Sequence, residues 1–178
     1  MLETISCVAI IAIVAALLTP VFRSAKLAGQ VTASVSNLHQ MHLALLLYQA
    51  KQGESSDANS ISAMGFPTVY QLDGLGLPAK VWKSPCGRNP SWFPAPITKE
   101  YEYFASTSLT QFDDAYRHLH DRTTMFIDMN CAEHGDPLIS DYIPHRALGV
   151  QMSGALLRLL KPGDYMFQAW WADSESQH

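Results

Sequence analysis

The chain has 178 residues, of which 48% are hydrophobic and only 16% are charged. This length allows one domain with or without a non-globular appendage, and the composition excludes collagen, low-complexity disorder and a small disulfide-rich scaffold. Residues 1–53 carry four charges, whereas residues 54–178 carry 15 acidic and 9 basic residues, a net charge of −6. An acidic C-terminal part disfavours nucleic acid as a partner, because phosphate binding requires clustered lysines and arginines.

An uncharged and mostly apolar run, TISCVAIIAIVAALLTPVF, occupies residues 4–22. As an α-helix it would be about 28 Å long, close to the roughly 30 Å hydrocarbon core of a bilayer. The run therefore predicts a membrane-spanning helix. A cleaved signal peptide would need basic residues before a shorter apolar stretch, whereas Glu3 precedes this one. The other alternative is a buried core helix of a soluble protein.

Apolar side chains then recur every three or four residues until Gly53. They are Leu27, Val31, Val35, Leu38, Met41, Leu45 and Tyr48. This spacing predicts an amphipathic helix that continues the apolar run, with Pro20 as a kink rather than an end. The whole helix would have about 48 residues and a length of about 70 Å, more than a globular core can bury.

The remainder of the chain predicts a small α+β head. Proline and glycine mark residues 53–98 as an irregular connection, with a short helix near residues 69–72. Antiparallel strands packed against the long helix would complete the head over residues 99–178. The strand-like runs are residues 101–105, 124–128, 150–160 and 165–171. The predicted organisation is a transmembrane half-helix (1–22), an amphipathic half-helix (23–52), the connection and the head.

Glu3, the apolar run up to Leu18 and Pro20-Val21-Phe22 together resemble the N-terminal segment of type IV pilins and type II secretion pseudopilins. Residues 36–48, SNLHQMHLALLLY, resemble the following segment of pseudopilin-like proteins with a prepilin-type methylation segment. The resemblance implies a pilin-like fold and a structural subunit rather than an enzyme. It also implies assembly roles for Glu3 and Pro20, with Glu3 paired to the N-terminal amine of a neighbouring subunit.

The resemblance also implies a location and partners. It places the chain in the inner (cytoplasmic) membrane as a single-pass protein with its head on the periplasmic or extracellular side. Arg23 and Lys26, taken alone, would place the head in the cytoplasm by the positive-inside rule. The expected partners are other pilin-like subunits, membrane proteins of the secretion machinery and lipid. Prepilin peptidase is a further expected partner if a leader exists. When Glu3 is aligned with the family's glutamate, that leader would lie upstream of Met1.

In the head, the resemblance is looser. Residues 82–86 lie where the subgroup often has a Cys-Pro pair, and residues 145–154 resemble a shortened His…Asp-Gly motif with Ser153 in place of the Asp. Cys86 and Cys131 fall in loops of a head placed in an oxidising compartment, so they either form a disulfide or remain free thiols. Cys7 is interpreted as a small apolar residue of the membrane helix.

Acidic residues of the head are weak candidates for calcium ligands, since major pseudopilins often bind calcium in a head loop. They are Asp113, Asp114, Asp136 and Asp141. The alternative is a solvated acidic surface, and no other cofactor is expected.

A histidine cluster raises a different class of function. His118, His120 and Asp121 superficially resemble a metallo-hydrolase motif, but their spacing does not reproduce it. One interpretation is that they form a zinc site together with Cys131, His134 and His145. The alternative is that they are polar residues of a loop.

The sequence therefore predicts a subunit of a type II secretion pseudopilus or a related filament. Three alternatives remain: a type IV pilin for adhesion, motility or DNA uptake, a membrane-anchored metal hydrolase, and a tethered binding module that does not polymerise.

Overall fold

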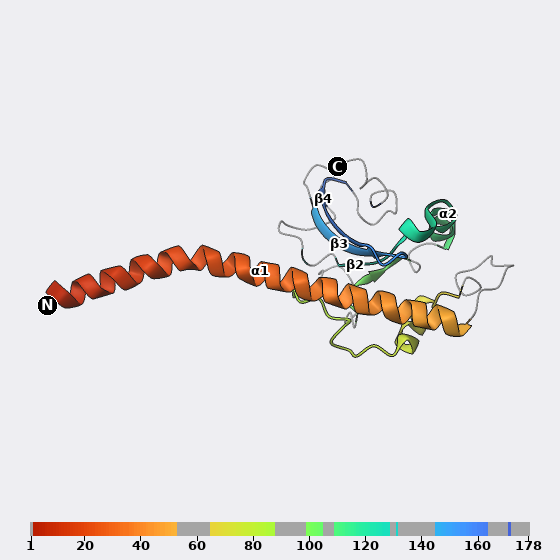
Figure 1. Cartoon of the computed structure of the whole chain (residues 1–178), viewed down its shortest axis with the longest axis horizontal. Helices are drawn as coiled ribbons and strands as arrows, with labels where there is room; N and C mark the ends of the chain where they lie inside the picture. The colour runs from red at the N-terminus through yellow and green to blue at the C-terminus, as the bar shows by residue number, and fades with distance from the viewer. Residues whose placement is uncertain are drawn as a thin grey trace.

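The computed structural model of the chain describes residues 2–52, 65–87, 99–104, 109–128, 131, 145–163 and 171. Its longest element is helix α1 (Leu2–Gln52), which has 51 residues and includes Pro20. The predicted continuation of the helix through Pro20 is confirmed. Figure 1 shows the N-terminal half of α1 projecting from the head with a gentle curve, while the C-terminal half lies along the sheet.

The head contains a four-stranded antiparallel sheet in the order β1-β2-β3-β4. Its strands are β1 (Glu102–Tyr103), β2 (Thr124–Asp128), β3 (His145–Gln151) and β4 (Leu156–Lys161). A long N-terminal helix on a small antiparallel sheet is an α+β architecture, as predicted from the sequence.

One predicted element of the head is wrong, and one helical segment was not predicted. The run 150–160 is not one strand, because a turn separates β3 from β4. Gly154 adopts a φ of 85° in this turn, a left-handed conformation that favours glycine. No helix was predicted where α2 (Leu109–Leu119) and the short η3 (His120–Arg122) lie. The short helix expected near residues 69–72 is present as η1 (Val69–Leu75).

Helix α1 lies across β2 and β3 and buries the apolar face that its sequence spacing predicted. Leu38, Met41 and Leu45 are fully buried against the sheet. Beside them, the rings of Tyr103 and Phe126 stack with centroids 4.9 Å apart. Removing this apolar surface from water is the main stabilising contribution to the contact between the helix and the sheet.

The opposite face of the sheet is covered as well, because all five residues of β2 are buried. Gly149 of β3 pairs with Ile127 of β2, so both belong to the same face. The ring of Trp171 lies directly over Gly149 on that face, where a Cβ atom would be 2.7 Å from the ring. Trp171 therefore occupies a position that only glycine leaves open.

We expect Gly149→Ala to lower the free energy of unfolding by about 1–3 kcal/mol, because the added methyl group overpacks the Trp171 ring. Gly29→Ala is the matched control: nothing lies within 4 Å of its Cβ position in the helix, so it should raise stability by about 0.5–1 kcal/mol. Urea unfolding in detergent, followed by tryptophan fluorescence, measures both. Unchanged stability in Gly149→Ala would contradict the placement of Trp171.

Candidate functional site

The N-terminal half of α1 presents a continuous apolar surface. Every side chain described between Val8 and Lys26 is exposed. The large apolar ones are 44–68% exposed: Val8, Ile11, Ile13, Val14, Leu17, Leu18, Val21 and Phe22. Among the described residues, α1 is the one helix long and apolar enough to cross a membrane, and none of its most apolar window is buried. Such a surface requires a lipid or protein covering, because soluble monomers rarely expose so large an apolar patch.

Helix α1 enters the head several residues after Phe22, the last residue of the apolar run. Leu27 is half-buried, and Val31 is the first described side chain of α1 that is buried. We call residues 2–26 the free segment of α1. It contains Glu3 and Pro20, the two predicted assembly residues.

Beyond Val31, a buried polar network joins α1 to the sheet, and we call its five residues the polar clamp. Its members are Ser34, Asn37, Ser84, Tyr101 and Asp128. The Asp128 carboxylate, fully buried at the end of β2, accepts hydrogen bonds from the hydroxyl groups of Ser34 and of Ser84, the latter at 2.9 Å. The Tyr101 hydroxyl donates to Ser34 Oγ at 3.3 Å and accepts from Asn37 Nδ2 at 3.1 Å. The clamp thus links the helix, the loop that carries Ser84, the residue before β1 and the end of β2 through directional bonds.

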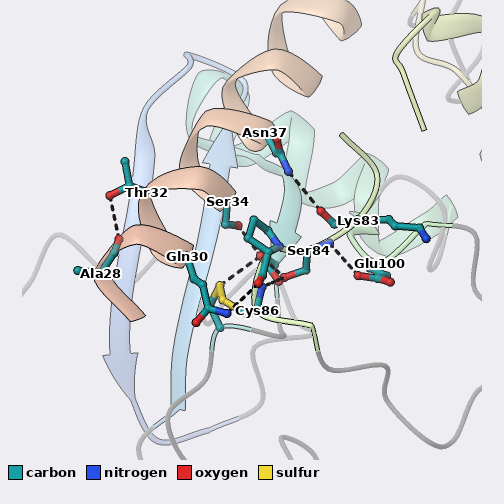
Figure 2. The surroundings of a disulfide bond; sticks show 12 residues. Ala28, Gln30, Thr32, Ser34, Asn37, Lys83, Ser84, Cys86 and Glu100 are labelled. Atoms are coloured by element: carbon teal, nitrogen blue, oxygen red, sulfur yellow. Dashed lines mark hydrogen bonds between the residues drawn. A yellow bond between two sulfur atoms is a disulfide. The ribbon is translucent and has the colours of Figure 1, made fainter. Parts of the chain in front are cut away.

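A disulfide lies beside the clamp and joins Cys86 to Cys131, with their Cα atoms 5.1 Å apart. The structure therefore brings together the two head cysteines whose pairing the sequence left open. Cys131 Sγ lies 3.5 Å from Asp128 Oδ2, but a disulfide sulfur carries no proton, so this is a contact and not a hydrogen bond. Figure 2 shows the disulfide packed under α1, beside Gln30 and Ser34.

The loop that carries Cys86 is also tied to its surroundings through backbone groups. Gln30 Nε2 of α1 donates to the carbonyl oxygen of Pro85 at 2.9 Å. Glu100 Oε2 accepts a hydrogen bond from the backbone N–H of Ser84 at 2.8 Å (Figure 2). The N–H of Glu100 donates to the Trp82 carbonyl oxygen at 2.8 Å. The first bond holds the loop against the helix, and the other two hold it against the segment that precedes β1.

A second attachment fixes the turn between β3 and β4 to α1. The buried His42 Nε2 donates to the carbonyl oxygen of Met152 at 2.9 Å. Gly154 packs on the same ring, where a Cβ atom would lie 3.0 Å from His42 Cε1. The segment that resembles a shortened His…Asp-Gly motif therefore ends in this turn, with Ser153 exposed and Gly154 against the helix.

The environment of the clamp changes the ionisation of its tyrosine. Burial and the neighbouring Asp128 raise the pKa of Tyr101 from 10.0 to about 12, while hydrogen bonds with Ser34 and Asn37 offset part of the rise. Burial also raises the pKa of Tyr103 on β1. Both hydroxyl groups therefore remain protonated at neutral pH.

The predicted metal ligands fall partly within and partly outside the described residues. Asp113 and Asp114 belong to α2, whereas Asp136, Asp141 and His134 lie outside the described residues. His118, His120 and Asp121 are exposed on α2 and η3. Cys131 is unavailable as a zinc ligand because it forms the disulfide. Within the described part of the chain, no three His, Cys, Asp or Glu residues are grouped to hold a metal ion.

Comparisons with protein families, with curated proteins and with solved structures find no match to this chain. The chemistry of the site therefore follows from its own geometry.

The polar clamp was not predicted, although the sequence contains one signal for it. Ser34 lies three residues after Val31 and four before Leu38, so it falls on the apolar face of the helix. A hydroxyl group at such a position needs a buried partner. The identity of that partner depends on the fold, because Asp128 is 94 residues away in the sequence.

We expect the double variant Cys86→Ser/Cys131→Ser to lose about 4 kcal/mol of unfolding free energy, because the disulfide closes a loop between residues 45 apart. Cys7→Ser, in the free segment, is the matched control and should leave the stability of the head unchanged. Chemical unfolding of the three proteins in detergent measures the difference. A double variant as stable as the wild type would contradict a stabilising role for the bond.

We expect the stability of the head to fall as the pH rises from about 10 to about 12. The raised pKa of Tyr101 favours the protonated form in the folded state, so its contribution is complete below pH 10 and is lost as the tyrosine ionises. Tyr101→Phe cannot ionise, and its stability should fall less steeply over this range. Tyr70→Phe, at a residue 92% exposed, is the control and should follow the wild-type curve.

Proposed function

We propose that this chain is a pilin-like structural subunit of a filament of the type II secretion pseudopilus class. One observation carries the proposal: a 51-residue helix leaves half its length apolar and exposed while its other half is fixed to a sheet. Lipid would cover the free segment in the stored subunit. The free segments of neighbouring subunits would cover one another in the filament.

The length of the free segment supports a role in crossing the membrane. Its 25 residues span about 37 Å as an α-helix, enough to cross the hydrocarbon core of a bilayer. The segment has one acidic residue, Glu3, near its end. A carboxylate inside an apolar helix bundle needs a charge partner, and the N-terminal amine of a neighbouring subunit would supply one. Such a pair would set the register between subunits.

The disulfide supports a head on the oxidising side of the inner membrane. Disulfides persist in the periplasm and outside the cell, whereas cytosolic thiols are kept reduced. The positive-inside rule gives the opposite orientation, but it depends here on two cations, Arg23 and Lys26. The disulfide is a covalent bond beside the attachment of α1, and on this ground we propose a periplasmic or extracellular head.

Cysteine cross-linking in membranes tests the proposal. In a Cys7→Ser background, Val14→Cys should form dimers and higher oligomers, because Val14 is exposed on the free segment. Glu3→Gln in the same protein should leave membrane insertion intact and lower the yield of cross-linked oligomers at least tenfold, since it removes one partner of a buried ion pair (about 3–5 kcal/mol).

Lys51→Gln is the matched control, because it neutralises an exposed charge at the other end of α1. It should cross-link like the parent protein. Two results would contradict the proposal: extraction of the chain from membranes by alkaline carbonate, or cross-linking that does not change in Glu3→Gln.

A further inference from the structure

An open groove lies at the border between α1 and the edge of the described sheet. It has a volume of about 180 Å³ and is lined by Val31 of α1, Leu148 of β3, and Arg158, Leu159 and Leu160 of β4. The Arg158 side chain is exposed, and Leu160 is 58% exposed. Arg158 forms no ion pair with any described residue. The groove therefore combines an apolar lining with one accessible guanidinium group.

The groove lies on the side of the head nearest to the free segment. Val31 is the first described side chain of α1 that is buried, and Figure 1 shows β4 on the side of the sheet turned toward the N-terminal half of the helix. Val31 follows Phe22, the last residue of the apolar run, by nine residues, or about 13 Å along the axis. A headgroup layer is roughly 5–8 Å thick, so the groove lies within about one Debye length of a membrane surface.

The segment that carries the groove differs in charge from the rest of the head's sequence. Residues 54–178 contain 15 acids and 9 bases, yet residues 145–161 contain Arg146, Arg158 and Lys161 and no acid. Arg23 and Lys26 are exposed on α1 just beyond the apolar run. The described cations beside the groove and at the membrane end of α1 are therefore Arg158, Arg23 and Lys26, which complement an anionic bilayer surface.

We propose that this groove is a docking site for the anionic phospholipid surface of the membrane that α1 crosses, and that it holds the head of the unassembled subunit against the bilayer. Arg158 would bond a lipid phosphate, which a guanidinium group can do with two parallel N–H donors. Leu160, which is exposed on β4, would contact the apolar part of the interface. A tilt of α1 of about 20°, the average for membrane helices, would bring β4 toward the surface. The inference depends on the proposed function only in requiring α1 to span the membrane.

Energy transfer between the head and the lipid headgroups tests this docking site. The full chain, with Cys7→Ser and a fluorophore on Ala155→Cys in the exposed β3–β4 connection, is reconstituted at low density. The vesicles contain an acceptor-labelled lipid in phosphatidylcholine alone or mixed with phosphatidylglycerol. We expect stronger transfer in the anionic vesicles. Arg158→Gln should lower the docked fraction about fivefold, the effect of removing one cation near the surface, and Leu160→Gln should lower it as well.

Lys80→Gln is the matched control, because it removes an exposed cation from a loop outside the groove, and it should behave like the parent protein. Equal transfer in the two kinds of vesicle, or an unchanged signal in Arg158→Gln, would overturn the inference. A signal that grows with protein density would overturn it in favour of a second copy of the chain in the groove. If the chain inserts but the energy transfer does not depend on the lipid, the docking site is overturned and the proposed function stands. If alkaline carbonate extracts the chain, the docking site and the proposed function are both overturned.

Discussion

The hydrogen bonds that Asp128 accepts from Ser34 and Ser84 connect the two parts of this molecule. Apolar contacts of Leu38, Met41 and Leu45 hold the helix to the sheet, but hydrophobic attraction is non-directional and tolerates sliding or rotation. A buried carboxylate cannot be left without its donors, so any rotation of α1 that breaks these bonds costs more free energy than the same rotation on an apolar surface. The clamp therefore fixes the direction in which the free segment leaves the head.

The disulfide adds a covalent restraint to the same place. Ser84, which donates a hydrogen bond to Asp128, lies in a loop that contains proline and little regular structure. Such loops open more easily than strands. Cys86–Cys131 ties this loop to the end of β2, next to the carboxylate that needs the loop's hydroxyl group. Covalent and polar restraints thus support each other: the bond keeps Ser84 near Asp128, and the buried network packs around the bond.

The sequence predicted those elements whose pattern can be recognised from neighbouring residues. The uncharged run and the spacing from Leu27 to Tyr48 predicted α1, because helix period and apolar length can be counted along the chain. Helix α2 was missed, since His118, His120 and Asp121 were interpreted as polar residues of a loop, although Leu109, Phe112, Tyr116 and Leu119 follow a helical spacing. The turn at Gly154 was missed because apolar residues continue on both of its sides. The clamp and the groove join residues far apart in the sequence, and no single-chain pattern shows which of them meet.

The spacing of the attachments along α1 has a mechanical consequence. Gln30, Ser34, Asn37 and His42 bond the head over 12 residues, or about 18 Å of helix axis. A force that pulls the helix along its axis stretches all these bonds together in shear, whereas a force that lifts one end would break them one at a time. The attachment of α1 to the head is therefore strongest against tension directed along α1. In a filament of the kind proposed above, load would act in this direction. The disulfide keeps the loop and the end of β2 from separating under that load.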